Sequence, residues 1–232
     1  IIFDVDGTLW DTTDVVAKAW NQAVASAGIE AKYITGEILK REFGKPMNVI
    51  AEDLFPELTQ EERERIMEFC CEYEHSYLEA CEEDLCYEGM RDTFITLSGK
   101  CRVCIVSNCQ SGYIEQFLRK TNLEAYVTDI ECYGNTKKSK GMNIKAVVER
   151  NQLTDPVYVG DTAGDCEASG EAGVPFIFAA YGFGAVPGTE KIDHNCRPFK
   201  IYRIMIRNQL KDFWNEVKKI CLLYTSDAAD DS

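Results

Sequence analysis

The sequence contains few histidines and little positive charge, and it has no long apolar run. Its 232 residues include only two histidines, which leaves little material for a Ser-His-Asp triad or a histidine zinc site. No segment approaches the roughly 18 uncharged apolar residues of a membrane-spanning helix. The 25 Lys and Arg are outnumbered by 39 Asp and Glu, which gives a net charge of −14. Because nucleic acids and anionic membranes attract basic surfaces, we expect neither as a partner.

Cysteine, by contrast, is abundant. The 11 cysteines form no repeating pairs, and their number is odd. This pattern is typical of reduced thiols, so we expect a cytoplasmic protein. Cys101 and Cys104 have the C-x-x-C spacing of redox and zinc motifs, but they fall on a predicted strand, where core packing is the commoner role of cysteine.

Apolar patterning predicts an α/β fold. Residues 1–10 open with a short apolar run, and residues 89–221 alternate such runs with segments of helical spacing. Strands that alternate with helices require crossover connections, which predict a Rossmann-like parallel sheet with helices on both faces. Further strands are expected at 103–106, 127–130, 157–159 and 174–178, and helices at 112–119, 143–150 and 163–172.

Residues 11–88 carry only helical patterns and are predicted to form a helical cap inserted after the first strand. Thr59 and Glu62 have the spacing of a capping box, which predicts the start of a helix. The apolar face of that helix is expected to comprise Ile66, Phe69 or Cys70, Tyr73, Tyr77 and Cys81. Residues 222–232 show no periodicity, and we expect a non-native or disordered tail there.

Asp4 and Asp6 follow the first apolar run directly, with Gly7 next. In an open parallel sheet, ligands bind beyond the carboxyl ends of the strands. A carboxylate held there can attack phosphorus and form an aspartyl-phosphate, which is the role predicted for Asp4. A carboxylate two residues further on can protonate the leaving oxygen and then activate water, so Asp6 is the candidate general acid and base. The alternative is an exposed acidic turn.

A second acidic pair follows another predicted strand. Asp161 and Asp165 lie four residues apart at the start of a predicted helix, so their side chains share one face. Two like charges at that spacing repel each other unless a cation or the helix N-terminus balances them. Mg²⁺ binds carboxylate oxygens and retains several waters, so these residues, with Asp4 and Asp6, predict a magnesium site. The alternative is a solvated acidic helix cap.

A phosphate site also needs hydrogen-bond donors and a fixed positive charge. Ser107 and Asn108 follow a predicted strand, where a hydroxyl and nearby backbone N–H groups can bind phosphate oxygens. A phosphoryl transition state requires a cation beside it. The candidates are Lys137, Lys138 and Lys140, in the predicted loop before the next helix, and we favour Lys140. An ordinary turn and solvated loop lysines are the alternatives.

These motifs, in this order, resemble those of the haloacid dehalogenase superfamily. They are Asp4-x-Asp6-Gly7-Thr8-Leu9, Ser107-Asn108, Lys140 and Gly160-Asp161-x-x-x-Asp165. The resemblance extends over about residues 1–200. The predicted helical insertion resembles the cap of the phosphoglycolate phosphatase-like branch.

The resemblance implies a role for each matching residue. Asp4 would be the nucleophile and a metal ligand, and Asp6 the general acid and base, with its backbone carbonyl on Mg²⁺. Asp161 would ligate the metal, and Asp165 would be a further acidic residue of the metal site. Thr8 would support its loop. The residues at the phosphoryl group would be Thr8, Ser107, Asn108 and Lys140.

The predicted function is therefore a Mg²⁺-dependent phosphatase acting on a small phosphorylated metabolite. Asp6 argues against dehalogenation, because dehalogenases lack a second carboxylate in this motif. A sugar phosphomutase of the same superfamily is the alternative, although such mutases commonly carry Glu-Asp where this chain has Gly160-Asp161. A non-enzymatic binding module is a more remote third hypothesis. Lys45, in a loop of the helical segment, is a candidate specificity contact.

Overall fold

The computed structural model describes residues 1–186, 201–202 and 217. In this part of the chain, six parallel strands form one sheet in the order β3-β2-β1-β4-β5-β6. The central strand is β1, where Ile2 lies opposite Cys104 of β2 and Tyr158 of β4. The predicted α/β class with a parallel sheet is confirmed. The strands are β1 Ile2–Phe3, β2 Cys104–Ser107, β3 Asp129–Cys132, β4 Tyr158–Gly160, β5 Phe176–Phe178 and β6 Ile201–Tyr202.

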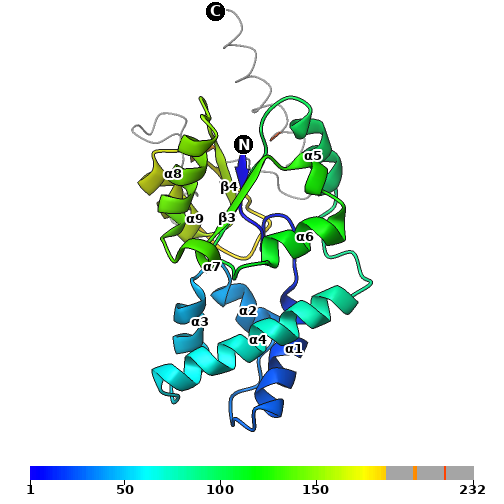
Figure 1. The fold of residues 1–232 in the computed structure, drawn as a ribbon, viewed down its shortest axis with the longest axis vertical. Coiled ribbons are helices and arrows are strands. Elements are labelled where there is room, and N and C mark those ends of the chain that lie inside the picture. Colours follow the sequence, from blue (N-terminus) through cyan, green and yellow to red (C-terminus); the bar gives the residue numbers. More distant parts are fainter. Residues whose placement is uncertain (187–200, 203–216, 218–232) are drawn as a thin grey trace, which may run out of the picture.

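Helices cover both faces of the sheet (Figure 1). Neighbouring strand residues point to opposite faces, so Phe3 packs with the helices α5 and α6, whereas Ile2 packs with α8 and α9. The Phe3 ring lies 5.3 Å from that of Phe94 in α5. The helices of this part are α5 Met90–Ser98, α6 Tyr113–Thr121, the 3₁₀ helix η1 Glu124–Tyr126, α7 Tyr133–Thr136, α8 Lys140–Arg150 and α9 Ala163–Ala172.

A group of helices lies beyond the carboxyl ends of the strands (Figure 1). We call residues 11–88, which contain these helices, the helical insertion; its role as a cap stays a prediction. The chain enters and leaves it side by side, because Asp11 N–H donates to Leu85 O at 2.9 Å and Tyr87 N–H donates to Leu9 O at 3.2 Å. The helices are α1 Thr13–Ser26, α2 Gly36–Glu42, α3 Met47–Leu54 and α4 Gln60–Ala80.

The capping box at the start of α4 is confirmed, and the predicted buried face is confirmed in part. Ile66 and Cys70 are buried, and Tyr73 and Tyr77 are partly buried against the core. Phe69, however, is 36% exposed, and Met67, Glu74 and Leu78 are buried although they were not expected to be. The buried row includes a carboxylate, Glu74, which accepts a hydrogen bond from Trp20 Nε1 of α1 at 2.8 Å. Glu74 is polar and interrupts the apolar periodicity of the buried face, so the sequence pattern did not indicate this face completely.

Other expected elements appear with small shifts. The strand expected at 127–130 is observed two residues later, because Tyr126 ends a 3₁₀ helix and Val127 is its cap. The predicted tail at 222–232 lies outside the described residues, as does most of the stretch from 187 to 221. All nine cysteines of the described part are free thiols. In that part, no helix has the length and apolar character needed to cross a membrane.

Replacing Thr59 by Ala is expected to destabilise the protein. Thr59 Oγ1 accepts from Glu62 N–H, and Glu62 Oε2 accepts from Thr59 N–H at 2.8 Å. Loss of this cap is expected to lower the free energy of unfolding by about 1 kcal/mol, measured by urea-induced loss of helical circular dichroism. Thr154→Ala removes an exposed threonine that makes no side-chain hydrogen bond in the described structure, and it is the matched control. Equal losses in the two variants would contradict the assigned role of the cap.

Candidate active site

The predicted strand ends meet at the centre of the sheet. Strands β2 and β3 lie on one side of β1, and β4 and β5 lie on the other, so the direction of the strand order reverses between β1 and β4. Open parallel sheets bind ligands at this switch point, beyond the carboxyl ends of the strands. Asp4 follows β1, Asp161 follows β4 and Ser107 ends β2. The Asp4 N–H donates to Val159 O at 2.8 Å, which fixes the backbone that carries its carboxylate.

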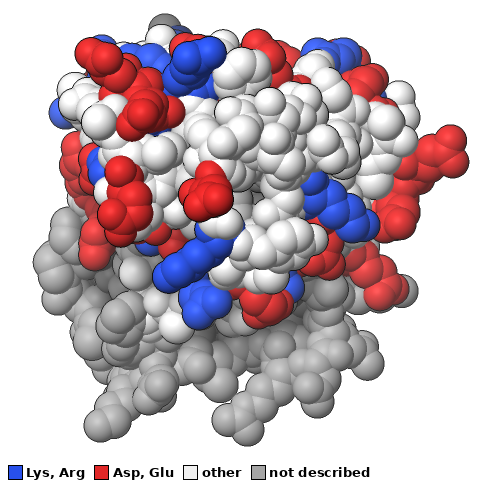
Figure 2. All heavy atoms as spheres, turned by 90° about the horizontal axis from the view of Figure 1, so that it is seen from below, with Lys and Arg blue, Asp and Glu red and all other residues white. Residues whose placement is uncertain are grey.

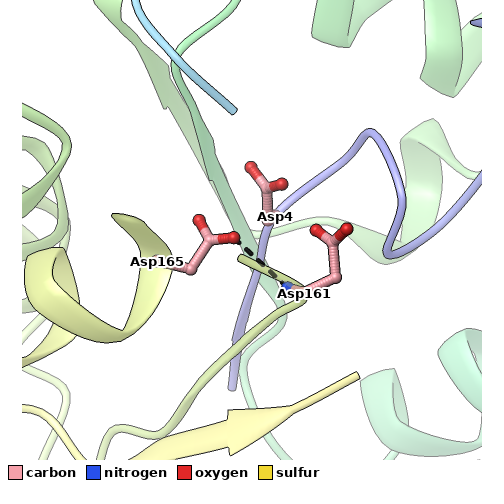
Figure 3. A group of neighbouring side chains, drawn as sticks. All are labelled: Asp4, Asp161 and Asp165. Atoms are coloured by element: carbon pink, nitrogen blue, oxygen red, sulfur yellow. Dashed lines mark hydrogen bonds between the residues drawn. The ribbon is translucent and has the colours of Figure 1, made fainter. Parts of the chain in front are cut away.

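Three carboxylates converge at this point (Figure 3). Asp4, Asp161 and Asp165 each offer an oxygen, and these oxygens lie within 4.8 Å of one another. The side chains are almost fully buried. The pKa of Asp161 is raised well above its usual value, first by burial and then by the charges of Asp165 and Asp4. A buried, all-oxygen set with excess negative charge fits a hard divalent cation such as Mg²⁺.

Lys140 is the only cation within hydrogen-bonding distance of this cluster in the described part of the chain. Its Nζ lies 2.9 Å from Asp4 Oδ1 and 2.6 Å from Asp165 Oδ1. Burial alone would lower the pKa of Lys140, but the charges of Asp165 and Asp4 outweigh burial and raise it, so the ammonium stays charged. Lys137 instead lies over the Tyr133 ring, 5.4 Å from its centroid.

The expectation that Lys140 lies in a loop is wrong, because it is the first residue of α8. The hydroxyl of Ser139 caps that helix by accepting from Met142 N–H at 3.2 Å. A buried cation in the first turn of a helix opposes the helix dipole. This position is therefore unfavourable for a lysine unless carboxylates face it, as Asp4 and Asp165 do.

Asp165 is the most heavily hydrogen-bonded carboxylate of the cluster. Its Oδ1 accepts from Lys140 Nζ and from Tyr158 OH at 3.3 Å. Its Oδ2 accepts from Asp161 N–H and from both the N–H and the hydroxyl of Thr162. A carboxylate has about four acceptor sites, so these five donors leave little room for a metal. Burial tends to raise the pKa of Asp165, but Lys140 and the Thr162 hydrogen bonds outweigh it, and the pKa is lowered.

Asp4 keeps more capacity than Asp165. Burial raises its pKa to about 6, although the charge of Lys140 and hydrogen bonds from Lys140 and Ser107 act against this rise. At neutral pH Asp4 is therefore mainly ionised, with Oδ1 held by Lys140. An ionised carboxylate with part of its acceptor capacity free can act as a nucleophile and as a metal ligand.

Asp6 is held at a single oxygen. Tyr113 OH donates to its Oδ1 at 2.6 Å, Trp10 Nε1 at 3.1 Å and Thr12 Oγ1 at 3.3 Å. Burial, together with the charges of Asp4 and Glu74, raises the pKa of Asp6 to about 8 despite these hydrogen bonds. Asp6 is thus largely protonated at neutral pH, and Oδ2, which takes none of these three bonds, is the atom placed to carry the proton.

The loop after β1 packs tightly on Asp161. Thr8 Oγ1 donates to Asp161 Oδ1 at 3.3 Å, and Phe183 N–H donates to Asp161 Oδ2 at 2.7 Å. Gly7 has a φ of +76°, and a Cβ added there would lie 2.1 Å from Asp161 Oδ2. A Cβ at Gly182 would lie 2.3 Å from Asp161 Cβ. The Asp161 carboxylate is therefore enclosed by positions where only glycine fits.

Gly160, the position that departs from the mutase pattern, is also closely packed. A Cβ added there would lie 2.6 Å from the Cβ of Asp165. Real Cβ atoms do not approach this closely, so a glutamate at position 160 would displace Asp165, together with its contact to Lys140. Glycine at position 160 is thus needed for the contact between Asp165 and Lys140.

A small pocket of about 30 Å³ adjoins Asp6, between the sheet and the helical insertion. Asn108 Nδ2 donates to Gly44 O of the insertion at 2.7 Å. Lys45 also lines the pocket, but its Nζ lies 2.7 Å from both Glu42 and Asp53. The remaining lining residues include Ser107, Gln110 and Tyr113 from the sheet side and Phe43, Met47, Ile50 and Glu74 from the insertion.

Several residues of this site were not predicted from the sequence. Tyr113 and Glu74 lie on helices whose patterns suggested only packing. Gly182 and Phe183 follow the last predicted motif by some 20 residues and approach Asp161 only through the tertiary fold. Trp10 was also not predicted as a donor to Asp6, although its position directly after the first motif could have suggested this role.

Solved structures share this fold. A haloacid dehalogenase-like family hydrolase from Streptococcus pneumoniae superposes with a TM-score of 0.67 at 17% identity, covering 79% of this chain and 85% of that one. A predicted phosphoglycolate phosphatase from Haemophilus somnus gives a TM-score of 0.72 at 16% identity, covering 93% and 96%. At these identities the similarity establishes the fold alone.

Sequence comparisons add the family. The chain is 28% identical over 200 residues to a phosphoglycolate phosphatase of Agrobacterium fabrum, covering 82% of this chain and 83% of that protein. A phosphoglycolate phosphatase of Vibrio parahaemolyticus is 24% identical over 200 residues, with coverage of 79% and 84%. The family model of haloacid dehalogenase-like hydrolases matches residues 1–179, which contain Asp4, Ser107, Lys140 and Asp161. The protein therefore belongs to the haloacid dehalogenase-like hydrolase family.

Proposed function

We propose that the protein is a Mg²⁺-dependent phosphatase that hydrolyses a small phosphomonoester through an aspartyl-phosphate on Asp4. The observation that carries this proposal is the buried Asp4 carboxylate, held by Lys140 and facing a second acidic group, Asp161, that keeps free acceptor sites. Both curated relatives are named phosphoglycolate phosphatase, which supports a phosphomonoester as the substrate class.

In the first step, Asp4 attacks phosphorus and the P–O bond to the leaving group breaks. Lys140 and Ser107 orient the carboxylate and lie where the phosphoryl oxygens gather negative charge. Protonated Asp6 gives its proton to the leaving oxygen. In the second step, Asp6, now ionised, takes a proton from water, and the water oxygen attacks phosphorus and releases Asp4 as a carboxylate.

Asp4, Asp161 and the backbone carbonyl of Asp6 are the groups that we propose hold Mg²⁺. The bound ion would neutralise charge on the phosphoryl oxygens and on the cluster. Asp165, which five donors already occupy, acts by fixing Lys140 and the start of α9. Thr8 supports Asp161 through its hydroxyl.

The helical insertion is proposed to act as a cap that excludes bulk water. Its Gly44 carbonyl and Glu74 carboxylate accept hydrogen bonds from Asn108 and Gln110 of the sheet side. In Figure 2 the face viewed from below mixes acidic with basic side chains and offers no continuous basic patch among the described residues. This distribution suits a small metabolite better than a polyanion.

The mutase alternative needs an aspartyl-phosphate that survives until a sugar is rephosphorylated. The Gly160-Asp161 pair favours hydrolysis, because such mutases commonly carry Glu-Asp there and Gly160 leaves no room for a glutamate without displacing Asp165. The products distinguish the two reactions: a phosphatase releases inorganic phosphate from a sugar phosphate, and a mutase gives an isomer. The third hypothesis, a non-enzymatic binding module, predicts neither product.

Replacing Asp4 by Asn is expected to abolish turnover. With p-nitrophenyl phosphate and Mg²⁺, kcat is expected to fall by about three orders of magnitude or more, because an amide cannot replace the nucleophile. Asp155→Asn, the same change at an exposed position, serves as the control. Activity in Asp4→Asn equal to that of the control would refute the mechanism.

Asp6→Asn is expected to lower kcat/KM most for substrates with poor leaving groups. An alkoxide needs the proton of Asp6, whereas p-nitrophenolate leaves without one, so kcat/KM for an alkyl phosphate is expected to fall by about 10²–10⁴ and that for p-nitrophenyl phosphate by much less. The measurement is the ratio of the two kcat/KM values in the variant and in the parent protein. An unchanged ratio would remove Asp6 from the role of general acid.

Chelation of divalent metal is expected to abolish hydrolysis, and Mg²⁺ is expected to restore it. Asp161→Asn is expected to raise the Mg²⁺ concentration for half-maximal activity by about tenfold or more, because a ligand is lost. Titrating Mg²⁺ into the metal-free protein and into this variant measures the shift. Full activity in the presence of a chelator would contradict the proposed metal site.

A further inference from the structure

We propose that the substrate's leaving group is a small alcohol bearing further hydroxyl or ammonium donors and no carboxylate, recognised by Glu74 and Asn108 in the pocket beside Asp6. This inference rests on the proposed phosphatase function and specifies its substrate class. It separates this chain from the substrate named for its curated relatives, whose leaving group, glycolate, carries a carboxylate.

Glu74 is a carboxylate in an interior position where packing alone would favour an apolar side chain. It is 3% exposed and lies between the buried residues Cys70 and Leu78 on α4. Its oxygens each accept one hydrogen bond, from Gln110 Nε2 at 2.9 Å and from Trp20 Nε1 at 2.8 Å. Two donors leave about half of its acceptor sites unused. A buried acceptor with spare capacity at the pocket wall calls for further donors.

Asn108 supplies a second, independent observation. Its Oδ1 is buried and has no hydrogen-bond partner among the described residues. The orientation of the amide is fixed, because its Nδ2 donates to the carbonyl of Gly44, and a flipped amide would set two oxygens against each other. The carbonyl oxygen of Asn108 therefore also lacks a donor, in the same pocket as Glu74.

The pocket offers no unpaired cation to a carboxylate ligand among its described lining residues. Lys45 is the sole lysine or arginine in that lining, and two carboxylates already balance it, those of Glu42 and Asp53. Glycolate would thus bring a negative charge toward Glu74 and toward the unpartnered Asn108 oxygen. A hydroxyl or ammonium group would instead satisfy both acceptors.

The assay compares two phosphates of similar size, 2-hydroxyethyl phosphate and 2-phosphoglycolate, which differ in CH₂OH against COO⁻. Measurement at pH 8 keeps Glu74 mainly ionised, since burial raises its pKa only to about 7. The parent protein is expected to favour 2-hydroxyethyl phosphate in kcat/KM by about tenfold or more. Equal values, or a preference for 2-phosphoglycolate, would overturn the inference.

Glu74→Gln tests whether this residue is the cause. The ratio of the two kcat/KM values is expected to fall by about tenfold in Glu74→Gln and to stay within about twofold in Glu72→Gln. Glu72 lies on the same helix, is exposed and lies outside this pocket, so its variant loses the same charge elsewhere. A ratio in Glu74→Gln equal to that of the parent would remove Glu74 from substrate recognition.

Different results would overturn the phosphatase activity and the substrate class. Hydrolysis of neither substrate, and none of p-nitrophenyl phosphate, would overturn the proposed phosphatase itself. Hydrolysis of p-nitrophenyl phosphate combined with a preference for 2-phosphoglycolate would overturn the substrate class alone. Because the ratio in the parent protein needs no variant, a folding defect in Glu74→Gln leaves the test intact.

Discussion

The contact on which the site depends is the buried ammonium of Lys140 between the carboxylates of Asp4 and Asp165. It joins the end of the central strand to the first turns of α8 and α9, across sequence separations of 136 and 25 residues. Placing three charges in the protein interior carries a large desolvation cost, which a hydrophobic replacement would avoid. Such an arrangement therefore indicates a chemical role, and the proposed aspartyl-phosphate mechanism supplies one.

The acidic residues around this contact differ in their hydrogen bonding. Asp165 accepts from five donors, through which it holds Lys140 and caps α9, whereas Asp4 and Asp161 accept from fewer donors. Asp6 is held instead at one oxygen by Tyr113, and burial together with the charges of Asp4 and Glu74 leaves it protonated near neutral pH. The proposed acid and the proposed nucleophile thus differ in their surroundings although they lie only two positions apart in the sequence.

The parts of this site that follow strands could be predicted from the sequence. An apolar run that ends in a carboxylate identifies Asp4 and Asp161, because parallel strands bring their carboxyl ends to one edge. The sequence favoured Lys140 among the three lysines, but it placed this residue in a loop, and its contacts depend on α8 beginning at Lys140 itself. Glu74 was not predicted as a site residue, because a charged residue on the buried face of α4 does not fit the apolar periodicity from which that face was predicted.

The central claim, a covalent phosphate on Asp4, is tested most directly by trapping the intermediate. The protein is mixed with substrate and Mg²⁺, quenched in acid during turnover and treated with borohydride, which reduces an acyl phosphate to an alcohol. Mass spectrometry of the peptide that contains Asp4 is then expected to show homoserine in place of aspartate at position 4. Active turnover with no modification at Asp4, or with modification at another residue, would contradict the account.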